Sequence, residues 1–183
     1  MREATKSEWA ETKKSKIHNN GMFAIKDIPK GTKIIEYVGD VVDKKESDRR
    51  SDMTYEKAGK NKEHGSVYIF ELNRKSDVDG DVEWNTARFI NHSCEPNCEV
   101  EIKSDKIWVV AIKDIKKGDE LGYDYGYDID DFESHPCLCG KKKCVGYIVK
   151  EENWPKLKRM LRDKRRKARV RRRISKKNAN LLM

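Results

Sequence analysis

The sequence lacks any long hydrophobic run. None of its apolar stretches approaches the about 20 residues that a membrane-spanning helix needs, and residues 1–9 do not contain the apolar segment of a signal peptide. We therefore predict no membrane contact and an intracellular, reducing compartment. The length of 183 residues accommodates one domain, with or without a tail. With 40% charged residues and a mean hydropathy of −0.96, some of the chain must be solvated.

Cysteine is absent from the first 93 residues, and then five cysteines fall between positions 94 and 144. Without an export signal, such clustering favours metal binding over disulfides. Cys137, Cys139 and Cys144 are close enough in sequence to supply three thiolates of a structural Zn²⁺ site. The fourth ligand has to be Cys94 or Cys98, and a set of free thiols is the alternative to a metal site.

Acidic residues are nearly missing from one segment. Residues 156–177 contain 14 Lys and Arg and one acid, a net charge of +13, so that the rest of this +9 chain carries −4. Such an arm could bind the phosphates of DNA, RNA or nucleosomes, and it resembles a nuclear-localisation patch. A solvated tail is the alternative, because no aromatic residue is interleaved for base stacking.

A short helix is expected where this arm begins, with Asn153 as its N-cap. Four apolar residues recur there at helical spacing: Trp154, Leu157, Met160 and Leu161. Beyond Arg162, apolar residues are too sparse to bury a surface, so we expect the remainder of the arm to be disordered when nothing is bound.

The chain before the arm has the pattern of a mostly β structure. Short β-rich runs bounded by turn residues predict strands at 21–25, 33–38, 41–42, 67–72 and 106–112. The charged residues 44–63 predict an exposed helix and loop. Residues 24–31 and 111–118 agree at seven of eight positions, which indicates one strand-turn-strand arrangement used twice.

Two polar motifs are candidates for a ligand site. Asn91 and His92 place an amide and an imidazole side by side before a Ser-Cys-Glu-Pro turn, as a polar pocket requires, although a satisfied structural pair is the alternative. Tyr123, Tyr125 and Tyr127 alternate, so a strand would put their rings on one face. That face would line a cavity or form an aromatic part of the core.

The order of these motifs is more specific than any one of them. The runs Gly-Met-Phe-Ala, Ile-Ile-Glu-Tyr-Val-Gly, Ala-Arg-Phe-Ile-Asn-His-Ser-Cys-Glu-Pro-Asn-Cys, Gly-Asp-Glu-Leu-Gly-Tyr-Asp-Tyr and Cys-x-Cys-Gly-x3-Cys follow one another. Together they resemble a SET domain with its post-SET segment. The resemblance covers residues 16–149. It implies a mostly β SET-domain fold: small curved sheets around a knot-like crossing, a few short helices and a zinc-bound post-SET loop.

The resemblance also divides the chain. It implies an N-terminal flank (1–15), a SET domain (16–130), a post-SET zinc segment (131–150), and a short helix with the basic arm (151–183). The zinc ligands would be Cys94, Cys137, Cys139 and Cys144, with Cys98 as the spare cysteine.

The SET family comprises protein-lysine methyltransferases that use S-adenosylmethionine. The resemblance places the methyl donor against nine residues: His18, Asn20, Gly21, Met22, Tyr68, Arg88, Asn91, His92 and Leu138. Asn19 replaces a glycine of the first motif. Because asparagine tolerates left-handed backbone better than other non-glycine residues, we expect the turn to survive.

Three tyrosines carry the implied catalytic roles. Tyr125 matches the family tyrosine that orients the amine and the methyl group, and Tyr68 stands beside it in the implied site. Tyr123 matches the position that sets how many methyl groups fit. A phenol there implies mainly monomethylation, with dimethylation second. Apolar tyrosine walls would favour the neutral lysine amine by desolvation.

The implied substrate is a protein that presents a lysine, either a histone or another basic nucleic-acid-associated protein. Residues 156–177 are the candidate contact to nucleic acid. The alternative function is a catalytically weak SET-like module that binds chromatin or nucleic acid through this arm. The compartment is either the nucleus and its chromatin or a microbial cytoplasm, with delivery to a host nucleus left open.

Overall fold

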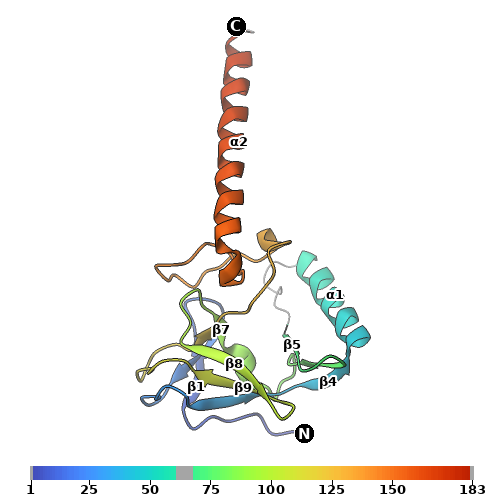
Figure 1. Ribbon diagram of the computed structural model, residues 1–183, viewed down its shortest axis with the longest axis vertical. Helices are drawn as coiled ribbons and strands as arrows, with labels where there is room; N and C mark the ends of the chain where they lie inside the picture. Colours follow the sequence, from blue (N-terminus) through green and yellow to red (C-terminus); the bar gives the residue numbers. More distant parts are fainter. Residues whose placement is uncertain (1, 61–67, 182–183) are drawn as a thin grey trace.

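The computed structural model describes residues 2–60 and 68–181. Within them the chain forms small β-sheets at one end and a long helix that leaves them, α2 (Trp154–Leu181) (Figure 1). Two sheets have two strands each: β1 (Ala10–Lys14) with β2 (Asn20–Ala24), and β7 (Asn91–His92) with β10 (Gly122–Tyr123). A third sheet has the strand order β3 (Lys33–Tyr37), β9 (Lys106–Ala111), β8 (Cys98–Lys103). The fourth has the order β4 (Asp40–Asp43), β6 (Ser76–Asp79), β5 (Ile69–Glu71). The mostly β SET-type architecture expected from the sequence is confirmed.

The core lies where these sheets face one another. β9 is the middle strand of its sheet, and Ile107, Val109 and Ala111 are at most 2% exposed. Met22 from β2 and Leu121 join the same cluster. Burial of β-branched and other apolar side chains from separate short strands holds together sheets that are each too small to be stable alone.

The two copies of the repeated octapeptide lie against each other in the structure, which the sequence analysis did not predict. The two copies, 24–31 and 111–118, pair with each other: Ile28 and Ile115 exchange backbone hydrogen bonds of 2.8 and 2.9 Å. The backbone N–H of Lys117 donates to the Asp27 carboxylate, and that of Lys30 donates to the Asp114 carboxylate. Equivalent residues therefore meet across a local two-fold relation that joins the start of the β structure to its end.

β7 and β10 form the crossing, a parallel pair in which Gly122 lies opposite Asn91 and Tyr123 opposite His92. The chain after β7 stays against β10, since the N–H of Ser93 donates to the carbonyl of Tyr123 at 3.0 Å. A Cβ on Gly122 would lie 2.8 Å from that of Ser93, so only glycine permits this approach. The crossing brings motifs about 30 residues apart to one point, as the resemblance implied.

Helix α1 (Lys44–Lys60) and short 3₁₀ turns (Thr86–Phe89, Phe132–Ser134 and Glu151–Asn153) complete the described elements. The helix predicted within 44–63 is therefore present. The predicted strand 67–72 is shorter, with β5 limited to Ile69–Glu71, and Val67 lies outside the described residues. The tyrosine strand is also shorter: β10 ends at Tyr123, and Tyr125 and Tyr127 follow it in irregular chain.

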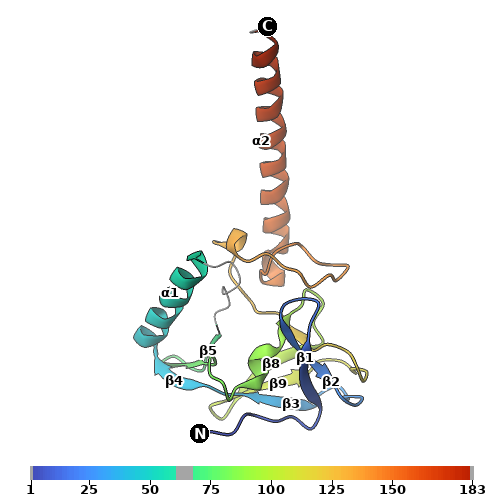
Figure 2. The same cartoon turned by 180° about the vertical axis from the view of Figure 1, so that it is seen from behind.

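The prediction of a disordered arm is wrong. Both ribbon views show α2 as one continuous rod that projects from the β structure, and its 28 residues extend about 40 Å at 1.5 Å per residue (Figures 1 and 2). Trp154 and Leu157 anchor its first turn in the body, whereas Met160 is 36% exposed. Arginine, lysine and alanine are strong helix formers, and this backbone preference continues the helix where apolar burial ends. In the described chain, no helix is long and apolar enough to cross a membrane.

Candidate active site and metal centre

Two cavities meet at the same pair of tyrosines. The His92 cavity, of about 200 Å³, is lined by Ile17, His18, Asn91, His92, Tyr125, Tyr127, Ser134, His135, Pro136, Cys137, Leu138, Cys139 and Ile148. The Tyr68 cavity, of about 300 Å³, is lined by Tyr37, Tyr68, Ile69, Phe70, Glu71, Arg88, Tyr123, Tyr125, Gly126 and Tyr127. Tyr125 and Tyr127 thus belong to both walls.

The structure distributes the nine residues predicted for donor binding over three places. His18, Asn91, His92 and Leu138 line the His92 cavity. Tyr68 and Arg88 line the Tyr68 cavity instead. Asn20, Gly21 and Met22 form part of strand β2, where the Met22 side chain is 1% exposed and packs in the core.

Asn91 ties the first motif to the crossing. Its Nδ2 donates to the carbonyl of Asn20 at 3.0 Å and to Oε1 of Glu120 at 2.8 Å. A Cβ on Gly21 would lie 2.3 Å from the same Glu120 oxygen, so a larger residue there would displace the carboxylate that Asn91 bonds. Asn19 has φ +32°, in the left-handed region, which is the backbone conformation expected for this substitution. The turn survives without its glycine.

His92 connects the crossing to the cysteines. Its Nδ1 accepts a hydrogen bond from the backbone N–H of Tyr125 at 3.3 Å, and its Nε2 lies 3.4 Å from Sγ of Cys94. Burial lowers the pKa of His92, although the Asp124 carboxylate opposes this. The neutral ring that accepts at Nδ1 carries its proton on Nε2, so the imidazole donates to the Cys94 sulfur.

Tyr125 lies at the centre of an aromatic row. Its ring centroid is 5.0 Å from that of Tyr123 and 5.8 Å from that of Tyr127, and its hydroxyl donates to the carbonyl of Ile90 at 3.0 Å. Burial raises the pKa of Tyr125 and of Tyr123 well above the ordinary value. Both phenols therefore stay protonated and can act as hydrogen-bond donors.

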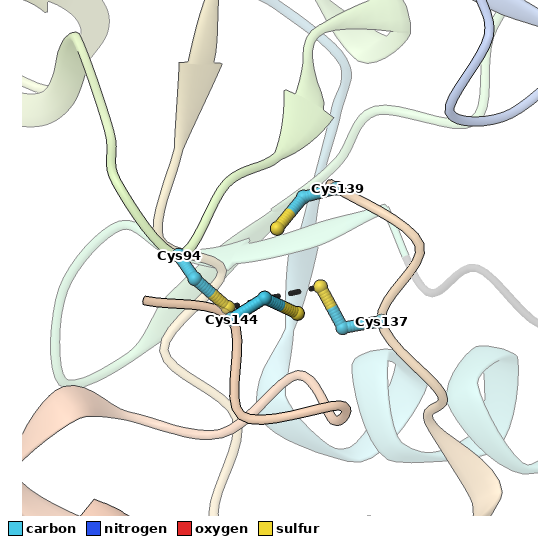
Figure 3. A group of neighbouring side chains, drawn as sticks. All are labelled: Cys94, Cys137, Cys139 and Cys144. Carbon is cyan, nitrogen blue, oxygen red and sulfur yellow. Dashed lines mark hydrogen bonds between the residues drawn. The ribbon is translucent and has the colours of Figure 1, made fainter. Parts of the chain in front are cut away.

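Four cysteines converge beside this row, from the turn after β7 and from the loop before α2 (Figure 3). The sulfurs of Cys94, Cys137, Cys139 and Cys144 all lie within 4.8 Å of one another, and those of Cys94 and Cys137 are 3.7 Å apart. A tetrahedral Zn²⁺ with Zn–S bonds of about 2.3 Å separates its sulfurs by about 3.8 Å. Cys98 is 1% exposed in the main core and is not part of this group.

The thiol electrostatics also fit a cation. Burial raises the pKa of Cys94 to about 12 and raises that of Cys137 as well. Burial acts in the same direction on Cys139, but backbone N–H groups of Cys94 and Lys141 outweigh it and lower its pKa. Thiolates packed this closely need a positive charge among them. Gly140, with φ +64°, makes the turn between Cys139 and Cys144.

Sequence reasoning missed residues on both walls. His135 is 7% exposed and lines the His92 cavity; its ring lies 4.7 Å from that of Tyr127, and Nε2 is 3.1 Å from the Asp131 carboxylate. Glu71 lines the Tyr68 cavity. No sequence signal marks either residue, whereas Glu120 stands in the Gly-Asp-Glu-Leu run that carried the resemblance.

Comparison of the sequence with known proteins finds relatives that are named as histone-lysine N-methyltransferases. The chain is 41% identical over 148 residues to "Histone-lysine N-methyltransferase trr" of Drosophila melanogaster, a match that covers 76% of this chain and 6% of that protein. It is 38% identical over 136 residues to "Histone-lysine N-methyltransferase 2D" of Homo sapiens, covering 72% and 2%. With "Histone-lysine N-methyltransferase, H3 lysine-4 specific" of Schizosaccharomyces pombe it shares 38% over 138 residues, covering 73% and 14%.

These matches span most of this chain but only a small part of each relative. The family model for the SET domain matches residues 19–126. That range contains β2, the crossing and the three tyrosines from Tyr68 to Tyr125 that the sequence analysis singled out. The chain therefore belongs to the SET-domain family.

Proposed function

We propose that this chain transfers a methyl group from S-adenosylmethionine to the side-chain amine of a lysine in a histone. Its family and the names of its relatives support this reaction. The observation that carries the proposal is the pair of cavities that share Tyr125 and Tyr127. A transfer between two substrates needs two binding sites that meet at the reacting atoms, and the shared tyrosines mark that meeting point.

The His92 cavity is proposed to hold the donor. His18 and Leu138 would contact it from opposite parts of the chain, with Asn91 and His92 beneath, and His135 would add a buried imidazole wall. S-adenosylmethionine supplies a methyl group on a sulfonium, which a neutral amine can attack directly. The chain's contribution is to orient the two reactants and exclude water.

The Tyr68 cavity is proposed to receive the lysine. Aromatic rings of Tyr68, Phe70 and Tyr123 form much of its wall. Removing water from a lysine amine favours the neutral form, which carries the lone pair for the new N–C bond. The phenol oxygen of Tyr125 is proposed to orient that amine by accepting a hydrogen bond from an amine N–H, while its own proton is donated to the carbonyl of Ile90 and the amine lone pair stays free.

The number of methyl groups is proposed to depend on Tyr123. This phenol is 7% exposed and its ring centroid lies 5.9 Å from that of Phe70. A hydroxyl at this position occupies space and can hold a water or the amine by hydrogen bonding. Monomethyl-lysine is therefore the expected main product, and trimethyl-lysine as the dominant species would contradict the assignment.

Zn²⁺ is proposed to be held by the four clustered cysteines. Its role is structural, since all four positions are filled by thiolates and none is left for water or substrate. Leu138 lies between two of these ligands and is 68% exposed at the edge of the His92 cavity. The metal would thus place an apolar contact for the donor.

The test is methyl transfer from radiolabelled donor to purified histones by the zinc-loaded chain. Replacing Tyr125 by Phe should lower kcat by about 10²–10³, as expected when an oriented hydrogen-bonding group at the reacting centre is lost. Tyr147→Phe is the matched control, because Tyr147 packs edge-on against Phe132 outside both cavities. No transfer by the unaltered chain, or equal rates for the two variants, would refute the proposal.

A further inference from the structure

Helix α2 has a free part that the proposed methyl transfer does not use. Its first turns are anchored: the indole N–H of Trp154 donates to the carbonyl of Val149 at 2.9 Å, and Leu157 is fully buried. From Arg162 onward every residue through 172 is exposed. Both ribbon views show this part standing clear of the sheets (Figures 1 and 2).

The free part is densely and evenly cationic. Residues 162–172 include six arginines, two lysines and one acid, Asp163. At 100° per residue these eight cations are distributed around the whole circumference of the helix. Lys164 pairs with Glu133. In the described parts of the chain no carboxylate pairs with the other seven.

This arrangement is unfavourable for a helix alone. Arg162 and Arg166, and likewise Arg165 and Arg169, stand four residues apart, where like charges on one face repel. The body does little to compensate for this repulsion, because among the described residues only Lys164 of these cations forms an ion pair with it. A polyanion that surrounds the helix would remove the repulsion and release its own counterions.

We propose that the free part of α2 binds in the major groove of duplex DNA. A helix with side chains is about 10–12 Å across, and the major groove of B-form DNA is about 12 Å wide, with phosphates along both walls. Cations all round the helix match two walls of phosphates, and arginine forks bind phosphate in a bidentate manner. A flat acidic protein surface would neutralise only one side of the helix.

The same features exclude other nucleic acids as preferred ligands. Residues 162–172 contain no aromatic side chain on which unpaired bases could stack, which disfavours single strands. The major groove of duplex RNA is too deep and narrow for a helix. The remainder of the chain outside 156–177 carries −4, so binding is confined to the helix. This inference does not depend on the proposed methyltransferase activity.

The experiment measures binding of the full chain to a fluorescent random-sequence DNA duplex over a range of salt concentrations. The test variant carries Arg165→Gln, Arg166→Gln, Arg169→Gln and Arg172→Gln. Glutamine is nearly as good a helix former as arginine, so α2 is retained. The matched control carries Lys30→Gln, Lys103→Gln, Lys113→Gln and Lys117→Gln, four exposed body lysines whose side-chain ammonium groups form no ion pair among the described residues.

At about 0.9 per phosphate contact, four lost contacts reduce the slope of log K against log salt by about 3.6. We expect this reduction, with binding at least about tenfold weaker at 0.1 M salt, for the arginine variant only. An unchanged slope in that variant, or an equal loss in the lysine control, would overturn the proposal. So would equally tight binding of single-stranded DNA, duplex RNA or polyglutamate of matched charge.

Discussion

The two halves of the candidate site are held together in different ways. The crossing, β7 and β10 with residues 93–97, is fixed by backbone hydrogen bonds and by the side chain of Asn97, which bonds to the backbone of Gly122 and Glu120. The cysteine loop, residues 131–150, has one 3₁₀ turn and an isolated bridge between Pro136 and Tyr147. The crossing is therefore held by its own backbone, whereas the loop has few backbone pairs, and we predict that its order depends on a metal held by its cysteines.

His92 is the link between these halves. Its Nδ1 accepts a hydrogen bond from the backbone N–H of Tyr125, which follows the crossing, and its Nε2 donates one to the sulfur of Cys94, which belongs to the cysteine group. A metal ion held by Cys94 would thus be joined to the position of Tyr125 through one neutral imidazole. The following predictions separate the two halves or test this link.

The largest effect is expected from metal removal. Stripping zinc with a chelator should weaken donor binding by at least about 100-fold, the upper end of what losing a supporting partner costs, since Leu138 lies between two ligands. Amide hydrogen exchange in the crossing should stay slow. Titration calorimetry with S-adenosylmethionine measures the first effect, and full donor affinity in verified metal-free protein would contradict it.

Replacing the link should have the next largest effect. His92→Gln should lower zinc affinity by about 10–100-fold, the usual cost of losing a group that hydrogen-bonds to a metal ligand. Competition with a chromophoric chelator measures this, and a purely structural histidine would leave the metal affinity unmoved. Because His92 also lines the proposed donor cavity, saturating zinc should restore donor affinity only in part, and complete restoration would show that His92 acts on the donor through the metal alone.

Gly122→Ala breaks the crossing without touching the cysteines. The added methyl would meet the Ser93 side chain at 2.8 Å, which predicts a loss of about 1–3 kcal/mol of unfolding free energy from overpacking. Urea denaturation measures it. The folded fraction should still bind zinc with the affinity of the unaltered chain, and a variant of unchanged stability would show that the contact relaxes at no cost.

The smallest effect is expected at the spare cysteine. Cys98→Ala removes one buried sulfur from the main core and should cost about 1 kcal/mol of stability. Zinc stoichiometry, measured by atomic absorption, should remain one ion per chain. A fall in bound zinc would instead make Cys98 a ligand.

The sequence predicted which cysteines come together. Spacing alone left Cys94 and Cys98 open, the family resemblance favoured Cys94, and the structure shows why: Cys98 enters β8 and faces the core, opposite Ala111, while Cys94 stays in the turn after β7. The sequence analysis also assigned Tyr68 and Arg88 to the donor, whereas both line the cavity that is proposed to receive the lysine. The position of a residue in the sequence does not reveal which of the two cavities beside Tyr125 it lines.

Long-range pairing accounts for what else was missed. The repeat was visible in the sequence, yet nothing in either copy specifies that Ile28 bonds to Ile115. His135 lies in the cysteine loop without periodicity to mark it, and its burial comes from packing against Tyr127. For α2, the prediction of disorder gave more weight to the sparse apolar residues than to the helix propensity of arginine, lysine and alanine, which continues the helix to Leu181.

Steady-state kinetics of one variant on each side of the shared tyrosines test the central claim most directly. Leu138 lines only the His92 cavity and Glu71 only the Tyr68 cavity. The account predicts that Leu138→Ala raises KM for S-adenosylmethionine alone, whereas Glu71→Gln raises KM for the histone alone. The reverse pattern, or equal changes in both constants for both variants, would contradict a donor and a lysine that meet from separate cavities at Tyr125.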